Sequence, residues 1–236
     1  MIRKQVKPQE HNGAIAARRQ ILNKNSGFAV REAYKTLRTN VRFFLRGKGC
    51  KRISITSAMS GEGKSITLLN LAISIAEDGQ KVLLIDADLR RPAMSRLMME
   101  IASPGLSNVL AGLDGIEDAI RKEVYPNLDV LFSGDVPPNP SELLGGDKMR
   151  ELIEEMSKKY DYVLVDTPPV SVVSDASIVT HLLDGVLLLV RQGHSNKEAV
   201  KRAVANLELT GIKPLGFVLN GIELSKDGVY GYGNNE

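Results

Sequence analysis

The sequence predicts an α/β domain built on a doubly wound, mostly parallel sheet that helices cover on both faces. Beyond Cys50, short apolar runs rich in β-branched residues alternate with helical patterns, which is the order of elements in such a fold. The apolar runs are nearly unbroken, as expected for parallel strands buried on both faces. A chain of 236 residues with 43% hydrophobic content suffices for one large domain or two small ones, and the continuous alternation favours one.

The first part of the chain differs from the rest. Residues 1–26 mix Lys, Gln, Asn and Gly without hydrophobic periodicity, so we expect a flexible basic arm there. Apolar residues then recur at spacings of three and four, which predicts one amphipathic helix over residues 28–46. Gly47 and Gly49 follow and would end this helix. Its apolar face consists of Val30, Tyr34, Leu37, Val41 and Phe44.

Six strands and four further helices are predicted after this helix. The strands are Arg52–Thr56, Lys81–Ile85, Leu128–Phe132, Tyr162–Val165, Gly185–Val190 and Leu215–Leu219. The helices are Lys64–Glu77, Ser141–Lys159, Asp175–His181 and Asn196–Leu207. Residues 225–236 are rich in Gly and Asn and carry no core pattern, which predicts a mobile tail and a folded domain over residues 27–224.

Cysteine content and the length of the apolar runs exclude several classes of protein. Cys50 is the only cysteine, so no intrachain disulfide can form, and with three histidines a zinc site of Cys and His is not expected. The longest apolar runs, such as Val186–Val190, are far shorter than the ~20 residues that span a bilayer. The opening residues do not resemble a secretory signal. We therefore expect a cytoplasmic protein whose membrane association, if any, comes from a partner.

The net charge of +3 hides a strong asymmetry between two parts of the chain. Residues 1–52 carry fourteen Lys and Arg against two acidic residues, whereas residues 53–236 carry seventeen against twenty-six. A basic segment of this kind can bind nucleic acid, anionic lipid or an acidic protein surface, or it can pack on the acidic body of its own chain. Composition alone leaves these partners open.

The segment SAMSGEGKS, between the first strand and the first long helix of the sheet, indicates a phosphate-binding loop (P-loop). Glycines let backbone N–H groups turn toward phosphates, and the following helix N-terminus adds partial positive charge. Lys64 would reach the β- and γ-phosphates and the Ser65 hydroxyl would bind Mg²⁺, although Ala58 stands where the G-x-x-x-x-G-K-[ST] pattern has its first glycine. The residues expected to bind ATP here are Ser60, Gly61, Glu62, Gly63, Lys64, Ser65 and Ile66.

Two acidic strand ends complete the predicted site. One predicted strand runs into Asp86 and Asp88, and another runs into Asp166. Ligands of open α/β sheets bind outside the carboxyl ends of the strands, where all three carboxylates would lie. Asp166 is expected to hold Mg²⁺ together with Ser65, and Asp86 and Asp88 lie on one face of an extended segment. Asp86 could accept the proton of an attacking hydroxyl, as a kinase requires, or both residues could serve only the metal.

The motifs GEGKS, LLIDADLRRP and YVLVDTPP, in this order and spacing, resemble the bacterial tyrosine kinases that regulate capsule and exopolysaccharide synthesis. The resemblance implies a Walker A loop at Gly61–Ser65, a Walker A′ strand with Asp86 and Asp88, and a Walker B aspartate at Asp166. It also implies ATP and Mg²⁺ as cofactors and a deviant P-loop fold shared with partition ATPases.

The resemblance also assigns the ends of the chain. Tyr230 and Tyr232 correspond to the tyrosine cluster that family members phosphorylate, and the surrounding glycines would let a tail enter a neighbouring active site; the alternative is an ordinary frayed terminus. Glu32, Lys35 and Arg38 correspond to an E-x-x-R-x-x-R stripe that builds a ring of subunits. Lys35 keeps the charge of the middle Arg but loses its bidentate fork, and an ordinary solvated helix face is the alternative. An acidic neighbouring subunit would then take the basic segment, with no need for nucleic acid.

Weaker signals lie outside these motifs. Asn220, at the end of the last predicted strand, resembles a base-contacting asparagine of related ATPases, but a turn before Gly221 explains it equally well. Arg90 and Arg91 could approach phosphate or substrate or be surface charges, and His194 is expected to be structural.

These observations predict a cytoplasmic, ATP- and Mg²⁺-dependent protein-tyrosine kinase that phosphorylates its own C-terminal tyrosines in trans. The resemblance further implies a split form of the family, in which a separate membrane protein recruits and activates the kinase at the inner face of the membrane and a tyrosine phosphatase opposes it. A partition or cell-division ATPase is the main alternative, although the second, signature lysine that such ATPases carry early in the loop is absent here. A nucleotide-sensing assembly scaffold is another.

Overall fold

A single seven-stranded sheet forms the centre of the computed structural model, in the order β3-β4-β2-β5-β1-β6-β7. The structure describes residues 20–47, 49–170, 175–209, 211, 212 and 214–222. The strands are β1 (Lys51–Ser57), β2 (Val82–Asp86), β3 (Ile120–Tyr125), β4 (Leu128–Leu131), β5 (Tyr162–Asp166), β6 (Gly185–Arg191) and β7 (Gly216–Asn220). All neighbouring strands are parallel except the pair of β3 and β4. The predicted doubly wound, mostly parallel sheet is therefore confirmed.

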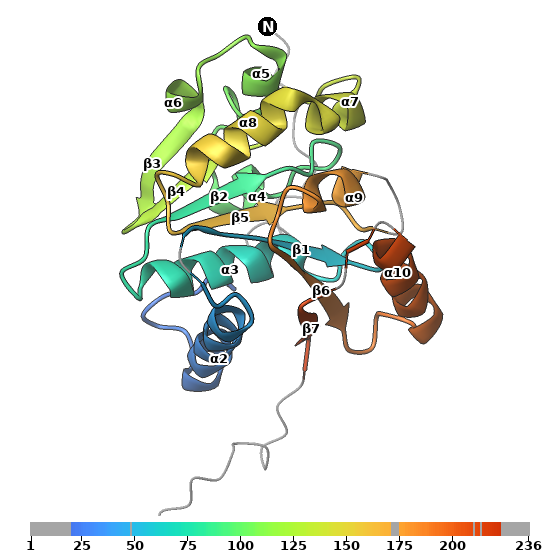
Figure 1. The fold of residues 1–236 in the computed structure, drawn as a ribbon. Coiled ribbons are helices and arrows are strands. Elements are labelled where there is room, and N and C mark those ends of the chain that lie inside the picture. The colour runs from blue at the N-terminus through green and yellow to red at the C-terminus, as the bar shows by residue number, and fades with distance from the viewer. Residues whose placement is uncertain (1–19, 48, 171–174, 210, 213, 223–236) are drawn as a thin grey trace, which may run out of the picture.

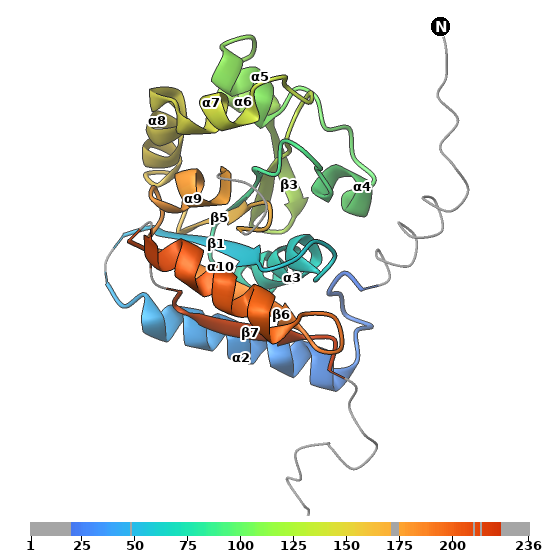
Figure 2. The ribbon, with the colours of Figure 1, turned by 90° about the vertical axis from the view of Figure 1, so that its right-hand side faces the viewer.

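Helices cover both faces of this sheet (Figure 1). One face carries α2 (Phe28–Phe44) and α3 (Lys64–Ala76), and the opposite face carries α8 (Asp147–Met156) and its neighbours. Figure 2 shows α8 and α2 on opposite sides of the strands. The remaining helices are α4 (Met94–Met98), α5 (Leu106–Ala111), α6 (Ile116–Ala119), α7 (Pro140–Gly145), α9 (Asp175–Thr180) and α10 (Lys197–Leu209).

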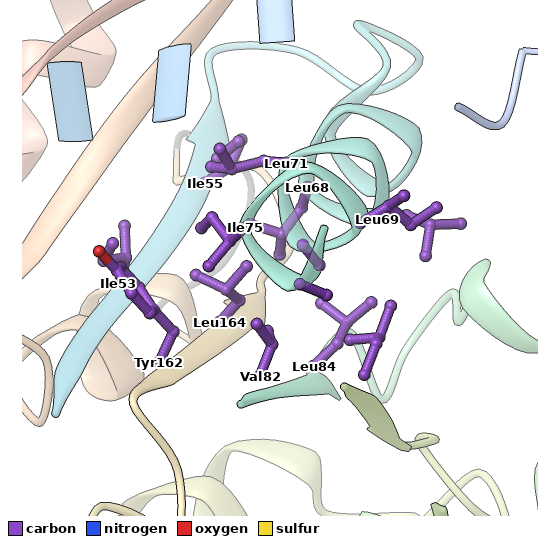
Figure 3. Close-up of a cluster of buried hydrophobic side chains, with 14 of the residues drawn as sticks. Ile53, Ile55, Leu68, Leu69, Leu71, Ile75, Val82, Leu84, Tyr162 and Leu164 are labelled. Carbon is purple, nitrogen blue, oxygen red and sulfur yellow. The ribbon is translucent and has the colours of Figure 1, made fainter. Parts of the chain in front are cut away.

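The core explains why the strands are apolar without alternation. Ile53, Ile55 and Leu164 point toward α3 and pack against Leu68 and Ile75 of that helix (Figure 3). Their neighbours along the same strands, such as Val163 and Val165, pack on the opposite face. Burying an aliphatic side chain of this size contributes roughly 1.5–3 kcal/mol, and here both faces of each central strand contribute.

One prediction about secondary structure was wrong, and four elements were missed. The edge strand β3 was not expected, because its sequence IRKEVY is charged and two of its six residues are exposed. The helix predicted over Ser141–Lys159 is divided into α7 and α8 by the extended backbone of Gly146 (ψ 161°). The short helices α4, α5 and α6 were not predicted, since four to six residues are too few to show a helical period.

The predicted N-terminal helix is present as α2 and ends two residues earlier than expected. Tyr34, Leu37 and Val41 pack into the core that α3 shares, whereas Val30 and Phe44 of the predicted apolar face remain exposed. Residues 1–19, most of the predicted arm, lie outside the described residues, as does the predicted tail. Among the helices that the structure describes, none is long and apolar enough to cross a membrane.

Candidate active site

The P-loop connects the carboxyl end of β1 to the first residue of α3. Gly61 and Gly63 have positive φ angles of 80° and 97°, which L-residues with a side chain rarely adopt. A Cβ atom on Gly63 would also lie only 2.5 Å from Nδ2 of Asn220. These glycines therefore permit the tight turn that precedes α3. The helix begins at Lys64, whose side chain is buried, and Ser65 is its second residue.

The three predicted carboxylates gather beside this loop. Asp86 ends β2 and Asp166 ends β5, and the two residues are direct partners across the parallel pair. Asp166 is also the register partner of Ile55 in β1, the strand that leads into the P-loop. Asp88 follows two residues after Asp86 and is half-buried. The structure thus brings together all the catalytic and metal-binding candidates of the sheet edge, at the edge to which the arrowheads of β1, β2 and β5 point in Figure 1.

Burial perturbs the two central carboxylates strongly. The side chain of Asp166 is 1% exposed, and neither of its oxygens has a hydrogen-bond partner among the described residues. This burial raises the pKa of Asp166 to about 6, although Lys64 and Ser65 counteract the rise. Burial and the charge of Asp166 also raise the pKa of Asp86 well above its ordinary value. The backbone N–H groups of Met94 and Asp88 donate to Asp86 at 3.2 and 3.3 Å and partly offset this.

This arrangement fits a magnesium ion. A buried carboxylate without donors is costly, and a cation bound to it would relieve that cost. Asp166 and the Ser65 hydroxyl supply the oxygen ligands that Mg²⁺ prefers. Within the described ranges no group of three or more His, Cys, Asp or Glu could hold a metal ion alone. Mg²⁺ would therefore share its ligands between these side chains and nucleotide phosphates, as it commonly does.

Arg90 is engaged by an ion pair that the sequence did not reveal. Its Nε donates to Oδ2 of Asp175 at 2.6 Å, and the Ser141 hydroxyl donates to Oδ1 of Asp175 at 2.6 Å. Burial alone would raise the pKa of Asp175, but these hydrogen bonds lower it below its ordinary value. The segment that follows Asp88 is thereby tied to α7 and α9, which fixes the acidic edge of the site.

Asn220 contacts the loop and not only its own turn. Its Nδ2 donates to the backbone oxygen of Glu62 at 2.9 Å, and its Oδ1 accepts from the N–H of Gly221 at 2.9 Å. The side chain of Glu62 is fully buried and accepts from the N–H of Met59 at 3.2 Å. The Ser195 hydroxyl of the turn between β6 and α10 also donates to the Glu62 carboxylate. Sequence reasoning missed this contact; the polar run QGHSN directly after an apolar strand was the available signal.

The remaining predicted residues lie elsewhere. Glu32 and Lys35 pair with each other at 2.7 Å on the exposed side of α2. Arg38 turns toward the end of α3 instead, where it donates to the Ser74 oxygen at 2.5 Å and pairs with Asp78 at 3.3 Å. Tyr230 and Tyr232 lie outside the described residues.

Comparison with known proteins identifies the family. Residues 50–209 match the AAA domain family. YwqD, a tyrosine-protein kinase of Bacillus subtilis (strain 168), is 43% identical over 201 residues that cover 85% of each chain. CpsD, a tyrosine-protein kinase of Streptococcus agalactiae, is 39% identical over 204 residues, covering 86% of this chain and 88% of its own. The chain belongs to the bacterial tyrosine kinases.

Solved structures of bacterial tyrosine kinases share the fold. The kinase domain of Escherichia coli ETK is 39% identical with a TM-score of 0.80, covering 86% of this chain and 80% of its own. The chimerical protein CapA2B2 is 34% identical with a TM-score of 0.79, covering 84% and 88%. The cell-division protein MinD of Pyrococcus horikoshii, in complex with Mg-ADP, is more distant: 29% identical with a TM-score of 0.63, covering 75% and 72%. The kinase prediction is confirmed over the cell-division ATPase, and membership of this family implies nucleotide binding.

Proposed function

We propose that this chain is an ATP- and Mg²⁺-dependent protein-tyrosine kinase that transfers the γ-phosphoryl group of ATP to Tyr230 and Tyr232 of a neighbouring copy. The observation that carries this proposal is Asp166, a buried carboxylate beside Lys64 and Ser65 that has no hydrogen-bond partner in the part of the chain that the structure describes. Similarity to named tyrosine-protein kinases over most of the chain supports the reaction type. The tail tyrosines as acceptors rest on the sequence and its resemblance to this family.

Each residue of the site has a role in this reaction. Lys64 and the P-loop N–H groups of Ser60–Ile66 would hold the phosphates and balance the negative charge that develops during transfer. Mg²⁺, when bound, would neutralise phosphate charge and orient the γ-phosphoryl group. Ser65 and Asp166 would hold the ion, with Asp88 as a further oxygen ligand.

Asp86 is the proposed proton acceptor. A tyrosine hydroxyl must lose its proton as its oxygen forms the new bond to phosphorus and the bond from phosphorus to the ADP oxygen breaks. The raised pKa of Asp86 makes its carboxylate more basic than an ordinary aspartate, which favours proton acceptance near neutral pH. Asp88 is more exposed and is the alternative acceptor.

The proposal extends to partners. A ring of subunits, in which each tail reaches the next active site, would use the exposed Glu32–Lys35 pair of α2 with Arg38. The solved chimerical protein CapA2B2 supports a separate adaptor for this kind of kinase. We infer that a membrane-anchored activator recruits this chain to the inner face of the membrane, that a tyrosine phosphatase opposes it, and that polysaccharide synthesis or export is the regulated process.

Intact mass after incubation with Mg·ATP tests the proposal. With an activator peptide present, we expect gains in steps of ~80 Da that disappear in Lys64→Met and in the double variant Tyr230→Phe/Tyr232→Phe. Lys81→Met is the matched control, because Lys81 is exposed at the opposite end of the sheet. ATP hydrolysis without any mass gain, insensitive to the tail substitutions, would refute the kinase proposal and favour an ATPase.

A further inference from the structure

We propose that Arg191, His194 and Asn220 are positioning residues that fix the P-loop in its phosphate-binding conformation from the outside. We call these three side chains the outer clamp. Arg191 is the last residue of β6, His194 lies in the turn between β6 and α10, and Asn220 is the last residue of β7. The clamp deepens the proposed function, since its value depends on nucleotide binding by the P-loop.

The clamp holds three consecutive carbonyl groups of the loop. Nε2 of His194 lies 3.1 Å from the oxygen of Ser60. An Nη1 group of Arg191 donates to the oxygen of Gly61 at 2.9 Å, and Nδ2 of Asn220 donates to the oxygen of Glu62 at 2.9 Å.

Because of peptide geometry, these contacts also determine in which direction the N–H groups of the loop point. In a planar trans peptide, the C=O of one residue and the N–H of the next point in opposite directions. Fixing the carbonyls toward the clamp therefore aims the N–H groups of Gly61, Glu62 and Gly63 away from it. No hydrogen bond among the described residues uses these three N–H groups. Successive N–H groups that face one side form a concave anion site, which is what a phosphate requires.

The donors are themselves held in place. The amide of Asn220 has only one productive orientation, because its Oδ1 accepts from the N–H of Gly221 while its Nδ2 faces Glu62. A carbonyl oxygen only accepts, so the nitrogen of His194 that faces Ser60 is assigned the proton. The turn is also joined to β7 by a hydrogen bond of 2.9 Å from the N–H of Gln192 to the backbone oxygen of Asn220.

A second link acts through the side chain of Glu62. One of its oxygens accepts from the N–H of Met59 inside the loop, and the other accepts from the Ser195 hydroxyl of the β6–α10 turn. The Ser195 hydroxyl in turn accepts from the N–H of Arg191 at 2.7 Å. Because Glu62 is fully buried, both of its contacts are sheltered from water and resist exchange with solvent. The loop and the turn are therefore joined through backbone and side chain alike.

The test measures affinity for a fluorescent ADP analogue in the presence of Mg²⁺. We expect Arg191→Met and His194→Ala to weaken binding by about 2- to 10-fold each, the range for loss of one net hydrogen bond. His194→Gln should restore most of the affinity, because its side-chain amide can donate to the same carbonyl. The matched controls are His181→Ala, whose ring contacts a carbonyl at α9, and Arg202→Met on the exposed side of α10.

A second readout separates positioning from general destabilisation. In the nucleotide-free protein, amide hydrogen exchange of Met59 and Thr67, whose N–H groups donate to Glu62 and Gly63 of the loop, should quicken several-fold in the Arg191→Met/His194→Ala variant, while strands β1 and β5 keep wild-type exchange rates. Asn220→Ala is compared with ADP and GDP: equal losses support the clamp, whereas a loss confined to ADP assigns Asn220 to base recognition.

The outer clamp is refuted if the Arg191 and His194 variants bind the ADP analogue within twofold of the wild type. All these measurements use the Tyr230→Phe/Tyr232→Phe background, in which no tail phosphorylation can occur. A wild-type protein that binds nucleotide but phosphorylates no tyrosine would contradict the proposed kinase function and leave the clamp measurement intact.

Discussion

Replacement of Asp166 by Asn should make the protein more stable at alkaline pH and, under the proposed function, should weaken its binding of Mg²⁺. Asp166 is buried and none of the described residues forms a hydrogen bond with its carboxylate oxygens, so its charged form is costly in the folded state. A group whose pKa is raised on folding favours the folded state at low pH, and this contribution is lost as the pH rises through the folded pKa. The penalty therefore grows between the ordinary pKa of 3.8 and about 6, and it is complete above that value.

The size of the effect follows from these two pKa values. A pKa of about 6 in place of 3.8 corresponds to about 3 kcal/mol of unfolding free energy above pH 7. At pH 4.5 most of the folded protein carries a proton on Asp166, and the penalty falls to about 1 kcal/mol. The amide of Asn also lacks partners, but that cost does not vary with pH. The change in the stability difference between pH 4.5 and pH 8, about 2 kcal/mol in favour of the variant, is therefore diagnostic.

Urea denaturation of wild type and variant at both pH values, in chelator and without nucleotide, measures this difference. Asp175→Asn is the control. Its pKa is lowered by Arg90 and Ser141, so its contribution persists until the pH falls below 3.8 and should change little between pH 8 and pH 4.5. A stability difference for Asp166→Asn that is the same at both pH values would show that the charge of this buried carboxylate carries no penalty.

Three further predictions concern the same edge of the sheet. Gly63→Ala should destabilise the protein by about 1–2 kcal/mol, because residue 63 has a left-handed φ of 97°, and it should lower nucleotide affinity. Adding Asn220→Ala to this variant should relieve only the clash between the new Cβ atom and the Asn220 side chain. Arg90→Ala should lower the unfolding free energy by about 2 kcal/mol, as measured by urea denaturation at pH 7. This value lies between those for exposed and buried ion pairs, because Asp175 is buried and Arg90 is partly exposed. An unchanged unfolding free energy would show that the ion pair contributes nothing. In the proposed kinase reaction, the Asp88→Asn variant should remain active, and its rate should fall as the pH drops through the raised pKa of Asp86. The Asp86→Asn variant should lose tyrosine phosphorylation at every pH. The reverse pattern would show that Asp88 is the proton acceptor.

The sequence predicted the sheet well where strands are buried on both faces. The runs that became β2, β5 and β6 contain almost only apolar residues, and burial of both faces permits no polar alternation. The same reasoning could not find β3, since an edge strand keeps charged residues such as Lys122 and Glu123 on its exposed side. The rule that functional residues gather at the carboxyl ends of parallel strands predicted Asp86 and Asp166 at the same end of the sheet, but it could not predict the register that makes them direct partners.

The contacts around the site could be predicted only in part. Glycines, lysine and aspartates have a chemical signature at fixed spacing, so the P-loop residues and the three acidic candidates were identifiable. Arg90 was identifiable as a candidate, but its partner Asp175 lies 85 positions away and no local pattern joins them. The contacts of Arg191 and His194 with the loop span 130 and 134 positions, and they depend on how the end of β6 and the turn after it pack against the P-loop.

The hydrogen bond from Asn220 to Glu62 joins residues 158 positions apart in the sequence. This separation means that the two partners are made at different times during synthesis. At about 5–20 residues per second, a ribosome needs roughly 8–30 s to add the residues between them. The nascent chain therefore contains the whole P-loop long before β6, its following turn and β7 exist to support it. We expect fragments that stop before residue 191 to bind nucleotide poorly even if their first strands pair correctly, so that competence to bind ATP is acquired only after β6, its following turn and β7 have been made.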